Sequence, residues 1–391
     1  MSTITFIFPH PVTGPTGGYK VVYEYANRLV ADGYKVNLVY SGSLFWKQKS
    51  FYFKLTNCVR YIQMLIKGYG CRKWFNLDKR VKEHLALSLN YRHVPKSDIY
   101  VCTSPYTAMY VKDYPTENKY YLIQDYENWG NVTDEKLIET YHYPLKKIVI
   151  SSWLARLMEE QGCDYTLIPN GFDFEYFKMS NHIEHRNKYT MGVMYRPAIV
   201  KGFKYGLAAL EIVKKEYPQL KVNIFGIEPR PDFLPEWYSY YQSPNKETHN
   251  RIYNEAAIFI GCSSVEGWGL PIGEAMICGA AVACTDNKGY LEMAKDGETA
   301  LVSPIKDAQT LANNIIRLIK DDELRHRIAK NGNKFIQQFG WESSYKKLKE
   351  TDNVVAKFAP AAIKVVFNPV PIPINSTANI VIKVLNTCSN D

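Results

Sequence analysis

Two glutamates, Glu266 and Glu274, lie eight residues apart on either side of a glycine-rich segment. The run before them, 257–263, is short and apolar, which is typical of a buried parallel strand. The residues after them have helical spacing, and Pro271 suits the first position of a helix, where a missing N–H leaves no bond unmade. The sequence therefore predicts a strand, a glycine loop and a helix N-terminus, in that order.

Such a segment presents free backbone amides and the positive end of a helix dipole to a bound molecule. Gly267 and Gly269 let the backbone approach a ligand closely and can adopt positive φ. We expect Glu266 in the loop and Glu274 about one turn inside the helix, so both can face one molecule. Two carboxylates beside an anion site suit a ligand with hydroxyls and phosphates, such as a nucleotide sugar. A helix cap with an acidic first turn is the simpler alternative.

The same residues resemble the signature of the retaining glycosyltransferases of the GT-B fold, in particular family 4, the glycosyl transferases group 1. That signature places Ala-Met and a small-residue turn after the second glutamate, as Ala275, Met276 and Gly279 do here. The resemblance extends over roughly residues 3 to 350, and its other marks follow in the family's order: Gly17-Gly18, Ile168–Asp173, Arg196, Lys201-Gly202, Asp296–Ala300 and Phe339–Trp341.

The resemblance implies a role for each residue of the two-glutamate motif. Glu274 would bind the ribose hydroxyls of the donor, and Glu266 would contact the donor sugar near the reacting carbon. The backbone amides of the intervening loop would touch the sugar and the diphosphate; they belong to Gly267, Trp268, Gly269 and Leu270.

Arg196 and Lys201 resemble the arginine and lysine that hold the donor diphosphate in this family. Because the leaving group is a nucleoside diphosphate, two cations would stabilise the charge that grows on it during transfer. Gly17 and Gly18 follow the first predicted strand, and the amides of the helix after them would face the diphosphate from the other domain.

Gln124 and Asp125 stand where many family members have a histidine near the reacting centre. Asp125 can orient an acceptor hydroxyl or cap the next segment, and the sequence does not choose between the two roles. Asp125 and Glu127 also have the spacing of a metal-binding Asp-x-Asp motif, but no second cluster of ligands accompanies them. We therefore expect catalysis without a metal or another cofactor, as is usual for the fold.

Alternating strand-like and helix-like runs predict an α/β protein. The resemblance implies the GT-B architecture, two Rossmann-like domains with parallel sheets facing a central cleft, and ligands bind beyond the carboxyl ends of such strands. We expect a first, acceptor domain over residues 1–172, completed by a helix at about 341–357, and a donor domain over 187–340. Within the first domain, residues 78–89 are expected to be helical. Residues 358–391 have no assigned role.

Composition narrows the class of protein. A chain of 391 residues that is 46% hydrophobic is long and apolar enough for two packed domains. Its eight cysteines include no Cys-x-x-Cys pair, which favours buried thiols in a reducing cytosol. The opening residues do not resemble a signal peptide, and no apolar run is long enough to span a bilayer. We expect a cytoplasmic protein, whether free or at the membrane surface.

A net charge of +9 favours anionic partners without naming one, and no basic recognition helix indicates nucleic acid as a partner. Residues 44–82 contain ten Lys or Arg, one acid, and many aromatic side chains. This composition is typical of a segment that rests on an anionic bilayer. A nucleic-acid contact would look similar, and a core helix with a solvated basic face is at least as compatible with it.

The resemblance implies a retaining glycosyltransferase whose donor is a nucleotide-diphosphate sugar. It would transfer a hexose or deoxyhexose, such as glucose, galactose, GlcNAc, mannose or rhamnose, to a hydroxyl of a growing, lipid-linked glycan in cell-surface polysaccharide or glycoprotein glycan synthesis. Two alternatives remain. One is a catalytically silent GT-B subunit that binds a glycan or a partner, and the other is a GT-B nucleotide-sugar epimerase.

Overall fold

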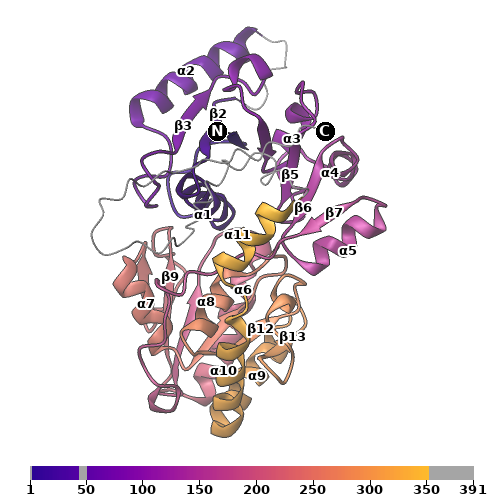
Figure 1. Ribbon diagram of the computed structural model, residues 1–391. Coiled ribbons are helices and arrows are strands. Elements are labelled where there is room, and N and C mark those ends of the chain that lie inside the picture. The colour runs from indigo at the N-terminus through magenta and orange to yellow at the C-terminus, as the bar shows by residue number, and fades with distance from the viewer. Residues whose placement is uncertain (1, 44–50, 352–391) are drawn as a thin grey trace, which may run out of the picture.

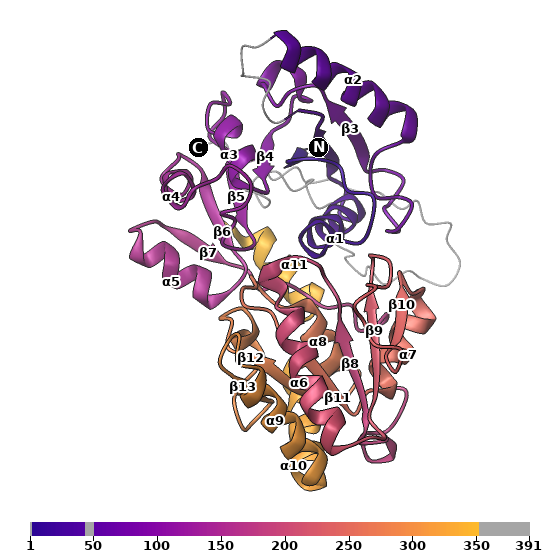
Figure 2. The same cartoon turned by 180° about the vertical axis from the view of Figure 1, so that it is seen from behind.

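The computed structural model describes residues 2–43 and 51–351, with the side chains from residue 55 onward in the second stretch. The chain forms two parallel sheets, each with helices on both faces (Figures 1 and 2). These are the two Rossmann-like units of an α/β fold. The alternation of short apolar strands with longer helices accounts for this arrangement, because parallel strands need a crossover helix and are covered on both faces.

The first sheet has the strand order β3-β2-β1-β4-β5-β6-β7. Its strands are β1 (Thr3–Phe8), β2 (Lys35–Ser41), β3 (Lys82–Ala86), β4 (Ile99–Cys102), β5 (Lys119–Ile123), β6 (Lys146–Val149) and β7 (Tyr165–Leu167). The helices of this unit are α1 (Gly17–Ala31), α2 (Phe51–Lys67), α3 (Pro105–Val111), α4 (Asp134–Tyr141) and α5 (Ser152–Glu160). The order reverses between β1 and β4, so the loops after these strands diverge and leave room for a ligand.

The second sheet has the order β10-β9-β8-β11-β12-β13 and reverses between β8 and β11. Its strands are β8 (Thr190–Met194), β9 (Lys221–Gly226), β10 (Ser239–Gln242), β11 (Ile258–Gly261), β12 (Ala281–Thr285) and β13 (Ala300–Ser303). Its helices are α6 (Phe203–Glu216), α7 (Lys246–Glu255), α8 (Leu270–Ile277), α9 (Ala308–Lys320) and α10 (Asp322–Ile336). Three of the predicted donor residues, Arg196, Lys201 and Glu266, lie in the two segments that leave the reversal point.

The expectation of a helix over residues 78–89 is wrong, because this segment contains β3 at the edge of the first sheet. Its residues have good helix propensity, but tertiary contacts decide the outcome. Glu83 points inward, where one oxygen accepts from the amide of Cys71 at 3.0 Å and the other lies 2.8 Å from Arg72. These partners, together with pairing to β2, stabilise the strand.

Within the described residues, the chain crosses between the two units twice, and the two crossings are bonded to each other. The amide of Phe172 donates to the carbonyl of Phe339 at 2.9 Å, and Phe172 forms a parallel bridge with Gly340. A Cβ on Gly171 would lie 2.6 Å from Cα of Trp341, so only glycine allows this approach. The crossings therefore run side by side.

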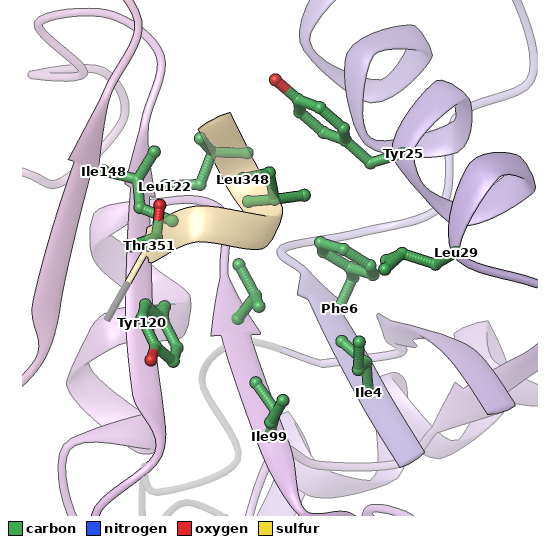
Figure 3. A pocket seen from close by; sticks show the side chains of 11 residues that line it. Ile4, Phe6, Tyr25, Leu29, Ile99, Tyr120, Leu122, Ile148, Leu348 and Thr351 are labelled. Atoms are coloured by element: carbon green, nitrogen blue, oxygen red, sulfur yellow. The ribbon is translucent and has the colours of Figure 1, made fainter. Parts of the chain in front are cut away.

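Helix α11 (Trp341–Glu350) follows the second crossing and returns to the first unit, as its yellow ribbon shows in Figure 1. Its Tyr345 hydroxyl donates to Asp32 at 2.9 Å, and Lys349 lies 2.8 Å from the same carboxylate. A cavity of about 40 Å³ lies between α11, α1 and the face of the first sheet. Figure 3 shows Leu348 of α11 and Leu29 of α1 at its walls. The expected extension of this helix over 352–357, and residues 358–391, lie outside the described residues.

Candidate active site

The loop after β11 carries the two-glutamate motif into α8. Gly269 is the N-cap of α8 with φ of 104°, a conformation that L side chains rarely adopt, and a Cβ there would overlap Tyr290. Glu274 lies one turn into the helix and is buried, whereas Glu266 lies in the loop. The helix N-terminus and both carboxylates thus have the positions that the sequence predicted.

Lys201 and Glu266 form an ion pair at the centre of this site, with 2.9 Å between Nζ and Oε2. Lys201 ends a short turn after β8, and Gly202 follows with φ of 62°. A Cβ on Gly202 would overlap the carbonyl of Cys262, so this position requires glycine. The hydroxyl of Ser263 donates to the other oxygen of Glu266 at 2.8 Å. Strand ends β8 and β11 therefore bring a cation and a carboxylate together at the reversal point of the sheet.

Glu274 has partners from both units. The Tyr253 hydroxyl donates to its Oε2 at 2.8 Å, and Nζ of Lys20 lies 3.8 Å from its Oε1. Lys20 belongs to the first turn of α1, on the opposite unit. Burial raises the pKa of Glu274, while Lys20 and Tyr253 oppose the rise. The carboxylate predicted to bind ribose is therefore desolvated and lies where the two units meet.

Arg196 also contacts the opposite unit, because its Nη2 donates to the carbonyl of Pro15 at 3.0 Å. Two residues later α1 begins at Gly17, and a Cβ there would lie 3.2 Å from Cδ1 of Leu270. Leu270 is the first residue of α8. The N-termini of α1 and α8 therefore converge from the two units, as a site that binds an anion from both sides requires.

Asp125 follows β5 and lies against the same loop. The backbone of Gln124 passes so close to Gly267 that a Cβ on this glycine would overlap the Gln124 carbonyl. A Cβ on Gly18 would lie 3.2 Å from the side-chain nitrogen of Gln124. Burial, together with the charge of Glu266, raises the pKa of Asp125 to about 6. Lys201 and the backbone amides of Tyr126 and Gly267 oppose this rise.

Glu127, two residues beyond Asp125, is a second buried carboxyl. Burial raises its pKa well above the ordinary range, and Asp125 adds to the rise. Its Oε2 has no hydrogen-bond partner in the part of the chain that the structure describes. Over that same part, no cluster of three His, Cys, Asp or Glu side chains has the arrangement of a metal site.

The Trp268 side chain is buried, and its ring packs edge-on against Phe339 with 5.2 Å between ring centroids. Only its backbone therefore faces the predicted donor position. Three residues that the sequence analysis did not single out complete the site, namely Lys20, Tyr253 and Ser263. Lys20 had a signal in the sequence, because a cation in the first turn of a helix lies where the dipole disfavours it.

Comparison with known proteins finds a family likeness over part of the chain. Residues 177–335 match the family described as glycosyl transferases group 1. The O-antigen chain mannosyltransferase B of Escherichia coli is 32% identical over 107 residues, which are 27% of this chain and 28% of the relative. A phosphatidyl-myo-inositol mannosyltransferase of Mycolicibacterium smegmatis is 25% identical over 225 residues, 52% of this chain and 56% of the relative. The chain thus spans about half or less of these curated relatives.

Solved structures show the same architecture along nearly the whole chain. A sucrose-phosphate synthase from Thermosynechococcus elongatus superposes with a TM-score of 0.68 at 16% identity, covering 92% of this chain and all of that one. The Anabaena protein HepE in complex with UDP-glucose has a TM-score of 0.67 at 17% identity, covering 90% and all. The fold is that of the GT-B glycosyltransferases. The likeness to the glycosyl transferases group 1 covers residues 177–335 of the 391.

Proposed function

We propose that this protein transfers a hexose or deoxyhexose from a nucleotide-diphosphate sugar to a hydroxyl of a growing, lipid-linked glycan. The observation that carries the proposal is the convergence of Arg196, Lys201, Glu266 and Glu274 at the N-termini of α1 and α8. Two cations and two sets of helix amides suit a diphosphate, and carboxylates suit hydroxyl donors.

The donor would bind with its ribose at Glu274 and its diphosphate between Arg196, Lys201 and the amides of Gly267 to Leu270. Lys201 has a flexible stem and a compact charge, so it can exchange its bond to Glu266 for one to a phosphate oxygen. Charge-assisted hydrogen bonds contribute about 1.5–3 kcal/mol each. They accelerate the reaction to the extent that they strengthen as charge develops on the departing diphosphate.

The transfer would retain the configuration of the sugar. In the family that the motif resembles, the leaving phosphate assists attack of the acceptor hydroxyl on the same face of the sugar. Asp125, in contact with Gly267 and near Glu266, would orient that hydroxyl. The two cations would take the place of a metal ion, so we expect turnover to continue in EDTA. Loss of activity that Mg²⁺ or Mn²⁺ restores would contradict this.

The acceptor would be presented at the cytoplasmic membrane surface. Helix α2 carries a stripe of exposed apolar residues one to two turns apart, with Arg60 and Lys67 beside it: Leu55, Val59, Ile62 and Ile66. A helix of this kind is typical of proteins that lie on an anionic bilayer. The two curated relatives are named as enzymes of O-antigen and phosphatidyl-myo-inositol mannosylation, which favours a lipid-linked acceptor and includes mannose among the candidate sugars.

The decisive experiment is release of nucleoside diphosphate from a panel of nucleotide sugars, with and without lipid-linked acceptors. We expect one donor to be consumed, and Glu274→Ala to weaken binding of the corresponding nucleoside diphosphate in calorimetry. Glu298→Ala, an exposed change in the same unit, is the matched control. Failure to bind any nucleoside diphosphate, with the fold intact, would refute the donor site.

A further inference from the structure

Helix α5 of the first unit begins at the boundary with the second unit, as both views of the ribbon show (Figures 1 and 2). The residue before it, Ser151, has the usual type for an N-cap but makes no capping hydrogen bond with its side chain. The first helical residue, Ser152, instead donates from its amide to Oε1 of Glu292 at 2.6 Å. Its hydroxyl donates to Oε2 of the same carboxylate at 3.0 Å.

Glu292 belongs to the second unit, 140 residues away along the chain. A carboxylate at a helix N-terminus is stabilised both by the free amides and by the helix dipole. The two bonds therefore join the units at one point, and the Glu292 carboxylate caps α5 in place of the Ser151 side chain. If the two units separated, the Ser152 amide would lose this bond and become exposed to solvent.

The next residue of α5, Trp153, directly contacts the loop that carries Glu266 and Gly267. The indole Nε1 of Trp153 donates to the carbonyl of Gly267 at 3.2 Å, and the ring is buried. Gly267 follows Glu266 and lies in the segment whose amides would bind the donor. A hydrogen bond to its carbonyl fixes the orientation of the peptide group that ends in the Trp268 amide.

The turn that carries Glu292 supports the same loop from its other side. A Cβ on Gly289 would overlap the carbonyl of Glu266, and the Tyr290 hydroxyl donates to Ser263 Oγ at 3.2 Å. Ser263 in turn donates to Glu266. The loop at Glu266 and Gly267 is thus held between the start of α5 and the turn Tyr290–Glu292.

We propose that Glu292 and Trp153 are positioning residues that set the geometry of the Glu266–Gly269 loop when the two units close. Glu292 joins the loop's supporting turn to α5, and Trp153 then orients the Gly267 carbonyl. Neither side chain belongs to the residues proposed to bind the donor, so both would act through the loop. The inference rests on the proposed transferase activity for its kinetic consequence, but the contact itself is independent of that activity.

The test has one structural and one kinetic arm. In hydrogen exchange of the ligand-free protein, Glu292→Ala should speed exchange in peptides that cover 152–156 and 266–270, and leave the core of β8 and β11 unchanged. Glu160→Ala, at the exposed far end of α5, should change neither peptide. Unchanged exchange in Glu292→Ala would overturn the proposal even if no sugar donor were ever found.

In the kinetic arm, Trp153→Phe keeps a six-membered aromatic ring and removes the five-membered ring together with its N–H. We expect kcat to fall about tenfold, which corresponds to 1.4 kcal/mol, with binding of nucleoside diphosphate unchanged. A merely structural role would lower the melting temperature and leave kcat of the folded fraction intact, and that result would overturn the proposal. A wild type that turns over no donor would instead refute the proposed function.

Discussion

Lys201 and Glu266 are each other's partner, and the other site residues also have a partner within the chain. Glu274 is paired with Lys20, and Arg196 with the Pro15 carbonyl. A donor must therefore exchange each of these contacts for one of its own. The net gain on binding is smaller than the sum of the new bonds, whereas the transition state, with more charge on the diphosphate, gains more than the ground state does.

Arg196→Ala and Lys201→Ala should each lower kcat/KM by at least about tenfold, or 1.4 kcal/mol. The reason is that each removes a cation from the proposed position of the leaving diphosphate. Lys204→Ala is the matched control, since Lys204 lies three residues beyond Lys201 and is exposed. Steady-state kinetics on folded variants provide the measurement, and wild-type turnover in both cation variants would show that the diphosphate binds elsewhere.

Asp125 should give the enzyme a pH dependence near neutrality. Its folded-state pKa of about 6 lies above the ordinary value, so the group loses its proton only as pH rises through about 6. If the carboxylate acts in its charged form, kcat/KM should rise over this range and level off, because that parameter reports groups of the free enzyme. Asp125→Asn should remove the rise. An unchanged profile in this variant would assign the titration to another group.

The same shift has a consequence for stability, with the sign fixed by linkage. Because the raised pKa means that the folded state binds the proton more tightly than the unfolded state, stability falls as pH rises toward about 6. Chemical denaturation between about pH 4 and 7 should show a shallower decline in Asp125→Asn than in the wild type. Glu127 will contribute in the same direction, since its pKa is also raised.

Among the elements, those with a strong apolar pattern were predictable, and a few short or marginal ones were not. Strands such as β1 and β12 are continuous apolar runs, and α9 has clear helical spacing. Local spacing predicted neither α3 nor β10, which are short, and it predicted a helix where β3 lies. The pairing of β3 with β2 and the ion pair of Glu83 with Arg72 come from other segments of the chain, so local spacing does not reveal this strand.

The candidate site was predictable where a motif stood within one segment, as for Glu266 and Glu274. It was not predictable where two units supply the partners. Lys20 lies 254 residues before Glu274, and no local sequence pattern predicts that the two side chains meet. The contact of Trp153 with Gly267 has the same character. Such pairs arise from how the two sheets meet, which no single segment specifies.

Helix α2 should decide where the protein acts rather than what it transfers. Replacing Val59 and Ile62 by Ser removes part of the exposed stripe and should reduce co-sedimentation with phosphatidylglycerol vesicles severalfold. Neutralising Lys47, Lys49, Lys54 and Arg60 should remove about 1 kcal/mol of attraction per charge, and added salt should weaken binding in the same way. The three lysines lie outside the residues whose side chains are described.

Ile305→Ser, an exposed apolar change in the other unit, is the control for the stripe. Transfer to a soluble acceptor analogue should be unchanged in all of these variants, because the site residues lie elsewhere. Equal sedimentation of wild type and variants at low salt would leave α2 as an amphipathic helix with a solvated face. No helix within residues 2–43 and 51–351 is long and apolar enough to cross a bilayer.

For the molecule as a whole, Gly171 should be a sensitive position although it lies away from the site. A methyl group on Gly171 would lie 2.6 Å from Cα of Trp341. Relieving this overlap would require the two crossing segments to move apart. We expect Gly171→Ala to destabilise the protein by about 1–3 kcal/mol, as overpacking usually does. Thermal melting is the measurement, and Gly14→Ala, where an added Cβ meets nothing within 4 Å, is the control.

The bonded pair of crossings also limits how the two units can move. Units joined by one flexible segment can tilt and twist in any direction, whereas two segments bonded side by side at Phe172 and Gly340 restrict these motions. The contacts across the boundary, such as Arg196 with Pro15 and Glu292 with Ser152, should therefore form and break together. Opening should accordingly be one concerted motion, and its rate would set an upper limit on how fast the proposed donor enters and the nucleoside diphosphate leaves.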